Sequence, residues 1–140
     1  MKCKRIAIIL VLFFAVSSIL STSAFARASS QIMYYDASLS LQRDGDLKVS
    51  FYITTVRAMD TLGASSIAIQ RYSNSSWITE FTFTPLNNPE IQSSNKSNYS
   101  KSVTYTPMYS NATYRAVTNF SAKSGSQTST AQATTEQVTT

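Results

Sequence analysis

Short runs of alternating apolar and polar residues constrain the fold of this chain more than any other feature of its sequence. Residues 47–55 read LKVSFYITT, and their odd positions are apolar until the run ends. Successive side chains of a strand point to opposite faces, whereas an amphipathic helix repeats every three or four residues. Residues 112–122 alternate in the same way, with Tyr114 and Phe120 on one face. Both stretches are therefore expected to be strands that bury one face.

The same pattern recurs along most of the chain, and no stretch has the spacing of a convincing amphipathic helix. Runs of this length, separated by regularly spaced turn signals, are typical of an antiparallel β-sandwich, with a small barrel as the alternative. The seven expected strands are residues 32–41, 47–55, 65–72, 77–83, 99–105, 112–122 and 128–138. The last of them is poor in bulky side chains, which places it at the edge of a sheet.

The connections between these strands are expected to be of two kinds. Tight turns are predicted at residues 43–46 and 73–76, where Asp, Gly, Asn and Ser gather. Residues 56–63 are expected to connect two strands, with one helical turn at 57–63 that ends at Gly63. Residues 84–98 contain two prolines and many Asn and Ser, and they are expected to form a long polar loop.

The first 26 residues have the three parts of a secretory signal peptide. Three basic residues precede the uncharged run 6–20, and the segment ends in Ala24-Phe25-Ala26. The expected organisation is a signal-peptide helix at 1–26 and a β-sandwich domain at 27–140, with an ordered core at about 32–138. The protein is expected to be secreted. The alternative is a membrane anchor at residues 6–25, which requires that the segment is not cleaved.

Charge and cysteine content exclude several classes of function. Of the twelve Lys and Arg, three lie in the signal segment, so the remaining nine face seven Asp and Glu. A nearly balanced charge without a basic patch does not predict nucleic-acid binding. The single cysteine, Cys3, also lies in the signal segment, so the exported domain is expected to have no disulfide and no cysteine-bound metal. No cofactor is expected.

The residues needed for hydrolytic catalysis are missing or badly placed. The chain contains no histidine, which a serine nucleophile of the Ser-His type requires as its base. Asp44 and Asp46 are close in sequence, but they flank Gly45 at an expected hairpin tip, where turn formation explains them. They lack the later ligands of a calcium loop. The chain is therefore expected not to be an enzyme and not to hold a metal.

Four aromatic residues are the candidate binding residues: Trp77, Tyr52, Tyr72 and Tyr99. Trp77 is the only tryptophan and could stack on a sugar ring. Its parity is shared with Phe81 and Phe83, which predicts instead that all three pack on one sheet face. Exposed tyrosines among Ser and Asn are typical of adaptable binding surfaces and also of ordinary solvated sheet faces. The polar segment 87–98 is a further candidate surface.

The sequence YRAVTNFSA at residues 114–122 resembles the penultimate strand of immunoglobulin-like and fibronectin type III-like domains. In those domains a Tyr near the start of this strand bonds back to the backbone, and Tyr114 is the matching position. The order of several further segments resembles a family of small exported proteins of Gram-positive bacteria that has no assigned function. Those segments are residues 58–64, 67–69 and 75–77, then Phe81, Phe83 and Asn95, and finally residues 100–105. The resemblance implies a sandwich fold and a secreted bacterial protein, and it brings no catalytic residues.

These observations predict a non-enzymatic extracellular interaction module of the β-sandwich class. Its expected partner is an extracellular protein or a polysaccharide, and the membrane is involved only through the signal segment if that segment is not cleaved. The alternative hypothesis is a carbohydrate-binding module that uses Trp77 and exposed tyrosines. The two hypotheses differ in whether the Trp77 ring is packed in the sheet or offered to solvent.

Overall fold

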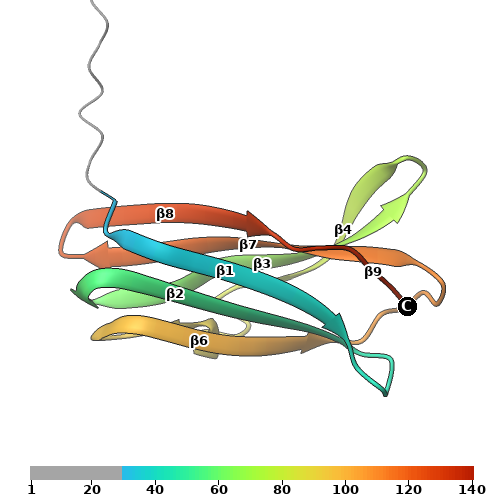
Figure 1. Cartoon of the computed structure of the whole chain (residues 1–140), viewed down its shortest axis with the longest axis horizontal. Coiled ribbons are helices and arrows are strands. Elements are labelled where there is room, and N and C mark those ends of the chain that lie inside the picture. The colour runs from blue at the N-terminus through green and yellow to red at the C-terminus, as the bar shows by residue number, and fades with distance from the viewer. Residues whose placement is uncertain (1–29) are drawn as a thin grey trace, which may run out of the picture.

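The computed structural model describes residues 30–140, which are built almost entirely of antiparallel strands (Figure 1). This part of the chain contains nine strands and one short 3-10 turn, η1 (Pro89–Ile91), and it has no α-helix. The expected signal segment at residues 1–26 and the start of the expected domain at 27 lie outside the described residues. No helix within residues 30–140 has the length and hydrophobicity needed to span a membrane.

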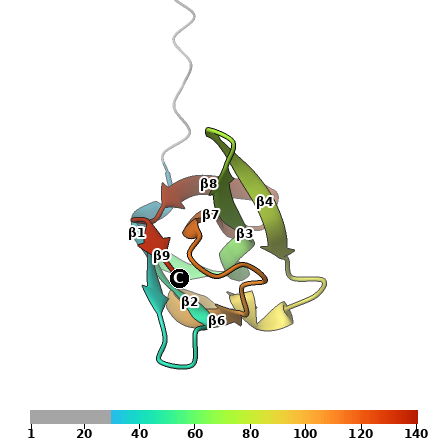
Figure 2. The same cartoon turned by 90° about the vertical axis from the view of Figure 1, so that its right-hand side faces the viewer.

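Two sheets face each other across a single core. The three-stranded sheet has the order β1-β2-β6, and the six-stranded sheet is built on the order β4-β3-β7-β8, with β5 paired to β3 and β9 paired to β7. Figure 2 looks along the strands and shows the two layers on opposite sides of the molecule. The predicted antiparallel all-β sandwich is therefore confirmed.

The strands of the three-stranded sheet are β1 (Ile32–Leu41), β2 (Leu47–Met59) and β6 (Lys96–Tyr105). The main strands of the other sheet are β3 (Thr61–Ser73), β4 (Ser76–Phe83), β7 (Thr113–Ser124) and β8 (Gln127–Thr134). Two short strands complete it, β5 (Gln92–Ser93) and β9 (Val138–Thr139). Seven of these nine strands correspond to the seven that the alternation predicts.

The core consists of the inward-facing residues of both sheets, as the alternation requires. In β2 and β7 every second side chain is buried over most of the strand. The largest fully buried side chains are those of Tyr114, Phe120, Leu47, Ile53, Met59, Leu62, Ile67, Ile69 and Ile91. At one side the sheets meet where the N–H of Gln31 donates to Ser129 Oγ, 3.1 Å away.

The prediction of a helical turn at residues 57–63 is wrong. β2 runs on to Met59 and β3 starts at Thr61, so Asp60 alone separates the two strands. Here the chain crosses from one sheet to the other, and Met59 pairs with Lys96 while Leu62 pairs with Ala122 and Ser93. Both side chains are buried because each sheet presents one of them to the core. Met59 and Leu62 therefore both reach the core because of this crossing, and not because of a helical turn.

Two other connections differ from expectation. The predicted polar loop 84–98 is shorter, because η1 and β5 occupy its middle and β6 starts at Lys96 rather than at Tyr99. The last expected strand is split into β8 and β9 by buried Thr135, whose Oγ1 accepts from the N–H of Ala116 at 2.9 Å. β8 is the last strand in the sheet order, so its predicted edge position is confirmed.

Candidate functional site

A bulge in β4 decides which way the only tryptophan points. Thr79 pairs with Gln70 and Phe81 pairs with Ile69, so Glu80 is an extra residue in β4. Directly opposed residues of two strands share a face, and an extra residue reverses the alternation beyond it. Trp77 therefore lies with Tyr72 on the outer face, whereas Phe81 and Phe83 lie opposite Ile69 and Ile67, which are buried. The prediction that Trp77 shares a face with these phenylalanines is wrong.

The outer face at this end of the sheet carries five side chains from three strands that form one continuous chain of contacts. We call Gln70, Tyr72, Trp77, Thr79 and Arg115 the Trp77 cluster. The Tyr72 and Trp77 rings are tilted, with centroids 5.1 Å apart, and the Arg115 guanidinium lies 4.2 Å from the centroid of the Trp77 ring. Arg115 Nε donates to Gln70 Oε1 at 2.8 Å, and Gln70 Nε2 donates to Thr79 Oγ1 at 3.3 Å.

Exposure within the Trp77 cluster is uneven. Trp77 is half-buried, and Arg115 lies over its ring, where a cation is attracted to the π face. Tyr72 is 48% exposed. Its ring is the larger aromatic surface that the cluster offers to solvent, and Trp77 supports it from the side. The β3–β4 hairpin that carries both rings projects beyond the other strands in Figure 1.

The inner side of the bulge holds a carboxylate that the sequence analysis did not single out. The Glu80 side chain is 5% exposed and forms an ion pair with Arg71 through Oε1 and Nε. Its Oε2 accepts from the Tyr105 hydroxyl at 3.1 Å and from the Tyr114 hydroxyl at 3.5 Å. The Arg71 guanidinium also lies 4.1 Å from the centroid of the Tyr109 ring. We call these five residues the Glu80 network.

Tyr114 makes the backbone contact expected at the start of its strand. Its hydroxyl donates to the carbonyl oxygen of Tyr109, five residues upstream, at 3.5 Å. This distance is longer than the roughly 3.0 Å limit usual for an O–H···O hydrogen bond, and so is the distance from the same hydroxyl to Glu80. Tyr114 is fully buried. Its ring therefore contributes mainly by packing, while its single O–H proton has two acceptors, both at 3.5 Å.

The pKa values in the Glu80 network are those expected of an ion pair that stabilises the fold and takes no part in catalysis. Burial, with the hydrogen bond to Glu80, raises the pKa of Tyr105 to about 12, and burial also raises the pKa of Tyr114. The hydrogen bond to Glu80 raises the pKa of Arg71 above its usual value. At neutral pH both tyrosines are therefore neutral donors and Arg71 is charged. A hydroxyl with a pKa this high is a poor general base at neutral pH.

The raised pKa of Tyr105 predicts a loss of stability in alkali. A tyrosine whose pKa is higher in the folded state stabilises the fold fully at pH values below its unfolded pKa of 10.0. It loses this stabilisation as the pH rises through its folded pKa of about 12. The free energy of unfolding is therefore expected to fall more steeply between these pH values in the natural protein than in Tyr105→Phe. Urea unfolding at a series of pH values measures this, and equal slopes for the two proteins would contradict it.

The four predicted binding residues lie in three places. Trp77 and Tyr72 lie together. Tyr52 lies on the outer face of the other sheet, where its ring centroid is 6.0 Å from that of Tyr34. Tyr99 packs against Phe51, and its hydroxyl donates to the Glu90 carbonyl oxygen at 2.6 Å. Sequence reasoning missed Arg115 and Gln70, which join the site because cross-strand register places them opposite each other. The sequence did contain one signal for Arg115: it alternates with Tyr114 and Ala116, so it is expected on the outer face of its strand.

The segment 87–98 is braced by its own contacts. Asn87 Oδ1 accepts from the N–H of Thr84 at 2.7 Å, and its Nδ2 donates to the carbonyl oxygen of Thr82 at 3.0 Å. Lys101 forms an ion pair with Glu90 at 2.8 Å. These bonds tie the segment to β4 and β6, and they leave few side-chain groups of η1 free to bind a partner.

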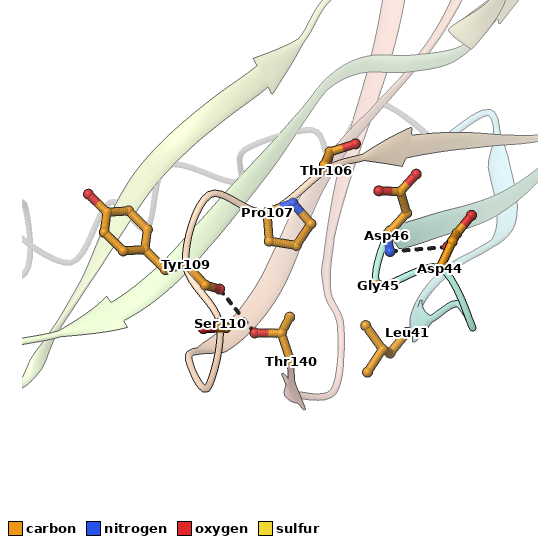
Figure 3. Close-up of a pocket in the computed structure, with 9 residues that line it drawn as sticks. All are labelled: Leu41, Asp44, Gly45, Asp46, Thr106, Pro107, Tyr109, Ser110 and Thr140. Atoms are coloured by element: carbon orange, nitrogen blue, oxygen red, sulfur yellow. Dashed lines mark hydrogen bonds between the residues drawn. The ribbon is translucent and has the colours of Figure 1, made fainter.

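A hollow of about 280 Å³ lies between the β1–β2 turn, the 106–110 segment and the end of the chain (Figure 3). Asp44 and Asp46 are on its rim, and Asp44 Oδ1 accepts from the Asp46 N–H at 3.2 Å. Across the hollow Thr140 Oγ1 donates to the Tyr109 carbonyl oxygen at 3.1 Å. The predicted turn role of Asp44 is confirmed. Within residues 30–140 no group of three or more His, Cys, Asp or Glu is placed to hold a metal ion.

Comparison with known proteins gives no assignment. No protein-family model, curated protein or solved structure matches the chain. The resemblance to immunoglobulin-like domains and to small exported bacterial proteins therefore stays a prediction from the sequence. The functional argument rests on the geometry of the Trp77 cluster and the Glu80 network.

Proposed function

We propose that this protein is an exported, non-enzymatic binding module that presents the Trp77 cluster to a macromolecule outside the cell. The observation that carries the proposal is the grouping of Trp, Tyr and Arg at one end of an outer sheet face. These three residue types dominate the energetics of protein interfaces. The export part of the proposal is supported by the signal-peptide pattern of residues 1–26.

The Trp77 cluster is held in place before any partner binds. Arg115 has a long side chain that loses considerable rotamer freedom when it is fixed. Here its guanidinium is already fixed by the Gln70 oxygen and by the Trp77 ring. Such preorganisation lowers the entropy cost of association.

The non-enzymatic part of the proposal is supported by the surroundings of the acidic groups near each candidate site. The Glu80 carboxylate is paired with Arg71 and accepts a hydrogen bond from Tyr105. The Asp44 carboxylate accepts a hydrogen bond from the backbone of its own turn. Glu80 does not line the hollow at the β1–β2 turn, and the only acidic side chain that shares its rim with Asp44 is that of Asp46, which belongs to the same turn. We therefore do not assign an acid–base pair to either carboxylate. Binding is therefore the activity that the described residues support best.

Carbohydrate binding is the alternative. The sequence predicts Trp77 as the ring that stacks on the sugar, and the geometry favours Tyr72 for that role. One face of the Trp77 ring is occupied by Arg115, so Trp77 does not offer both faces for stacking. The more exposed Tyr72 ring takes the role of platform in this version. Aromatic rings that present a flat apolar surface with a polar edge suit either kind of partner.

The proposal predicts that Tyr72→Ala reduces partner binding about ten-fold while the protein stays folded. The full chain, recovered after export, is immobilised and incubated with envelope and medium fractions of the organism that encodes it. The retained protein and carbohydrate are then quantified. Tyr52→Ala is the matched control, since Tyr52 is 40% exposed on the opposite outer face. Equal retention by both variants and the natural protein would show that the Trp77 cluster is not the binding site.

A further inference from the structure

A row of polar side chains crosses the outer face of the six-stranded sheet beside the Trp77 cluster. Asn119 of β7 is opposed by Ser66 of β3 on one side and by Gln132 of β8 on the other. Asn119 Nδ2 donates to Ser66 Oγ at 2.9 Å, and Gln132 Nε2 donates to Asn119 Oδ1 at 2.7 Å. We call these three residues the amide row. Both amides are thereby fixed in orientation, and each keeps unused donor or acceptor capacity.

The surface beside the amide row is hollowed. A depression of about 500 Å³ is lined by Asn119 and Gln132 together with Ser65, Phe120, Thr130 and Ala131. Its volume is larger than that of the hollow at the β1–β2 turn. Ser65 lies at an irregularity in the pairing of β3 with β7, where the regular ladder is interrupted. The depression is therefore a consequence of this irregularity and of the small side chains around it.

The amide row and the Trp77 cluster lie on one continuous face. Asn119 and Arg115 are four residues apart on β7 and point to the same side, which places them about 13 Å apart along the strand. Between them the face presents Val117 and its cross-strand partner Ala68, both half-buried. The face thus offers fixed amides at one end, a small apolar area in the middle and the Tyr72 ring at the other end.

The charge of this face limits what it can bind. The outward side chains of β3, β4, β7 and β8 include two cations, Arg115 and Lys123, and no carboxylate among the described residues. Glu80 on β4 lies on the inner side, where it is paired with Arg71. An anionic or neutral ligand therefore meets no like charge on this face.

We propose that this outer face binds a glycan chain that extends from the amide row to the Tyr72 ring. Sugar hydroxyls both donate and accept hydrogen bonds, which matches side-chain amides and hydroxyls, and the apolar side of a sugar ring packs on an aromatic ring. The middle of this face is formed by Ala68 and Val117, and Ala is depleted in protein–protein interfaces, so this area suits a glycan better than a protein. This inference deepens the proposed function and rests on it.

The test compares variants at the two ends of the face. The full exported chain is mixed with insoluble cellulose, chitin and peptidoglycan, and the pelleted fraction is measured against glycan concentration. Gln132→Ala and Tyr72→Ala are each expected to raise the apparent Kd about ten-fold for the glycan that binds. Gln42→Ala and Tyr52→Ala, which change a half-buried glutamine and an exposed tyrosine elsewhere, are expected to leave it unchanged. Circular dichroism and urea unfolding verify that each variant is folded.

The outcomes separate this inference from the proposed function. Loss of pelleting in Tyr72→Ala but not in Gln132→Ala would overturn the extended site and confine binding to the Trp77 cluster. No pelleting of the folded natural protein on any of the three glycans, together with Tyr72-dependent retention of a protein partner, would overturn the glycan inference alone. Absence of both kinds of binding would overturn the proposed function as well.

Discussion

Replacing Gly63 by alanine is expected to destabilise the protein by about 3 kcal/mol or more. Gly63 has φ +149°, and a Cβ built on it would lie 2.2 Å from the carbonyl oxygen of Ile91 and 2.8 Å from the Cα of Gln92. Both neighbours are backbone atoms, so relief of the clash requires β5 and η1 to move away from β3. That movement would expose Ile91, which is fully buried.

Urea unfolding of Gly63→Ala measures this loss, and the other two glycines provide matched controls. Gly45 and Gly125 also have positive φ, at 90° and 59°, but a Cβ at either position meets no atom within 4 Å. Alanine there is expected to cost about 1 kcal/mol from backbone strain alone. A similar loss in all three variants would show that backbone conformation, rather than the contact with Ile91, explains the requirement for glycine.

Replacing Glu80 by glutamine is expected to lower the free energy of unfolding by about 2 kcal/mol. Glutamine keeps the shape and can still accept from the Tyr105 hydroxyl, but it removes the charge that pairs with Arg71. The Glu80 network joins β3, β4, β6 and β7, so its loss is expected to loosen the projecting β3–β4 hairpin first. Urea unfolding gives the stability, and hydrogen exchange locates the loosening.

Glu90→Gln is the control for this variant. Glu90 and Lys101 form the second ion pair of the described residues, but the Glu90 side chain is 56% exposed. Exposed pairs contribute little, so this change is expected to have no resolvable effect on unfolding. If Glu90→Gln and Glu80→Gln cost the same, burial of the Glu80 network would not be the source of its contribution.

The candidate site was predicted only in part. Trp77 and Tyr72 were expected to be binding residues, and they do lie together. Tyr52 and Tyr99 were grouped with them as aromatic residues expected to be exposed, and the two-layer arrangement places them elsewhere. Arg115 was not predicted, because its contact with Trp77 depends on how three strands are aligned.

The sequence by itself determined the strands, because apolar alternation with a period of two fits only a strand that is buried on one face. It also determined the β1–β2 turn, where Asp44 and Gly45 supply the local geometry. These features depend on residues that are close together in the chain. Local propensity and hydrophobic pattern are therefore enough to specify them.

Only the tertiary structure decided the bulge at Glu80 and the crossing at Asp60. Parity along β4 predicts the wrong face for Trp77 because the extra residue is accommodated by contacts that are distant in sequence. Glu80 turns inward to reach Arg71, Tyr105 and Tyr114, which lie on three other strands. A buried carboxylate must be paired, and its partners exist only after the two sheets have come together.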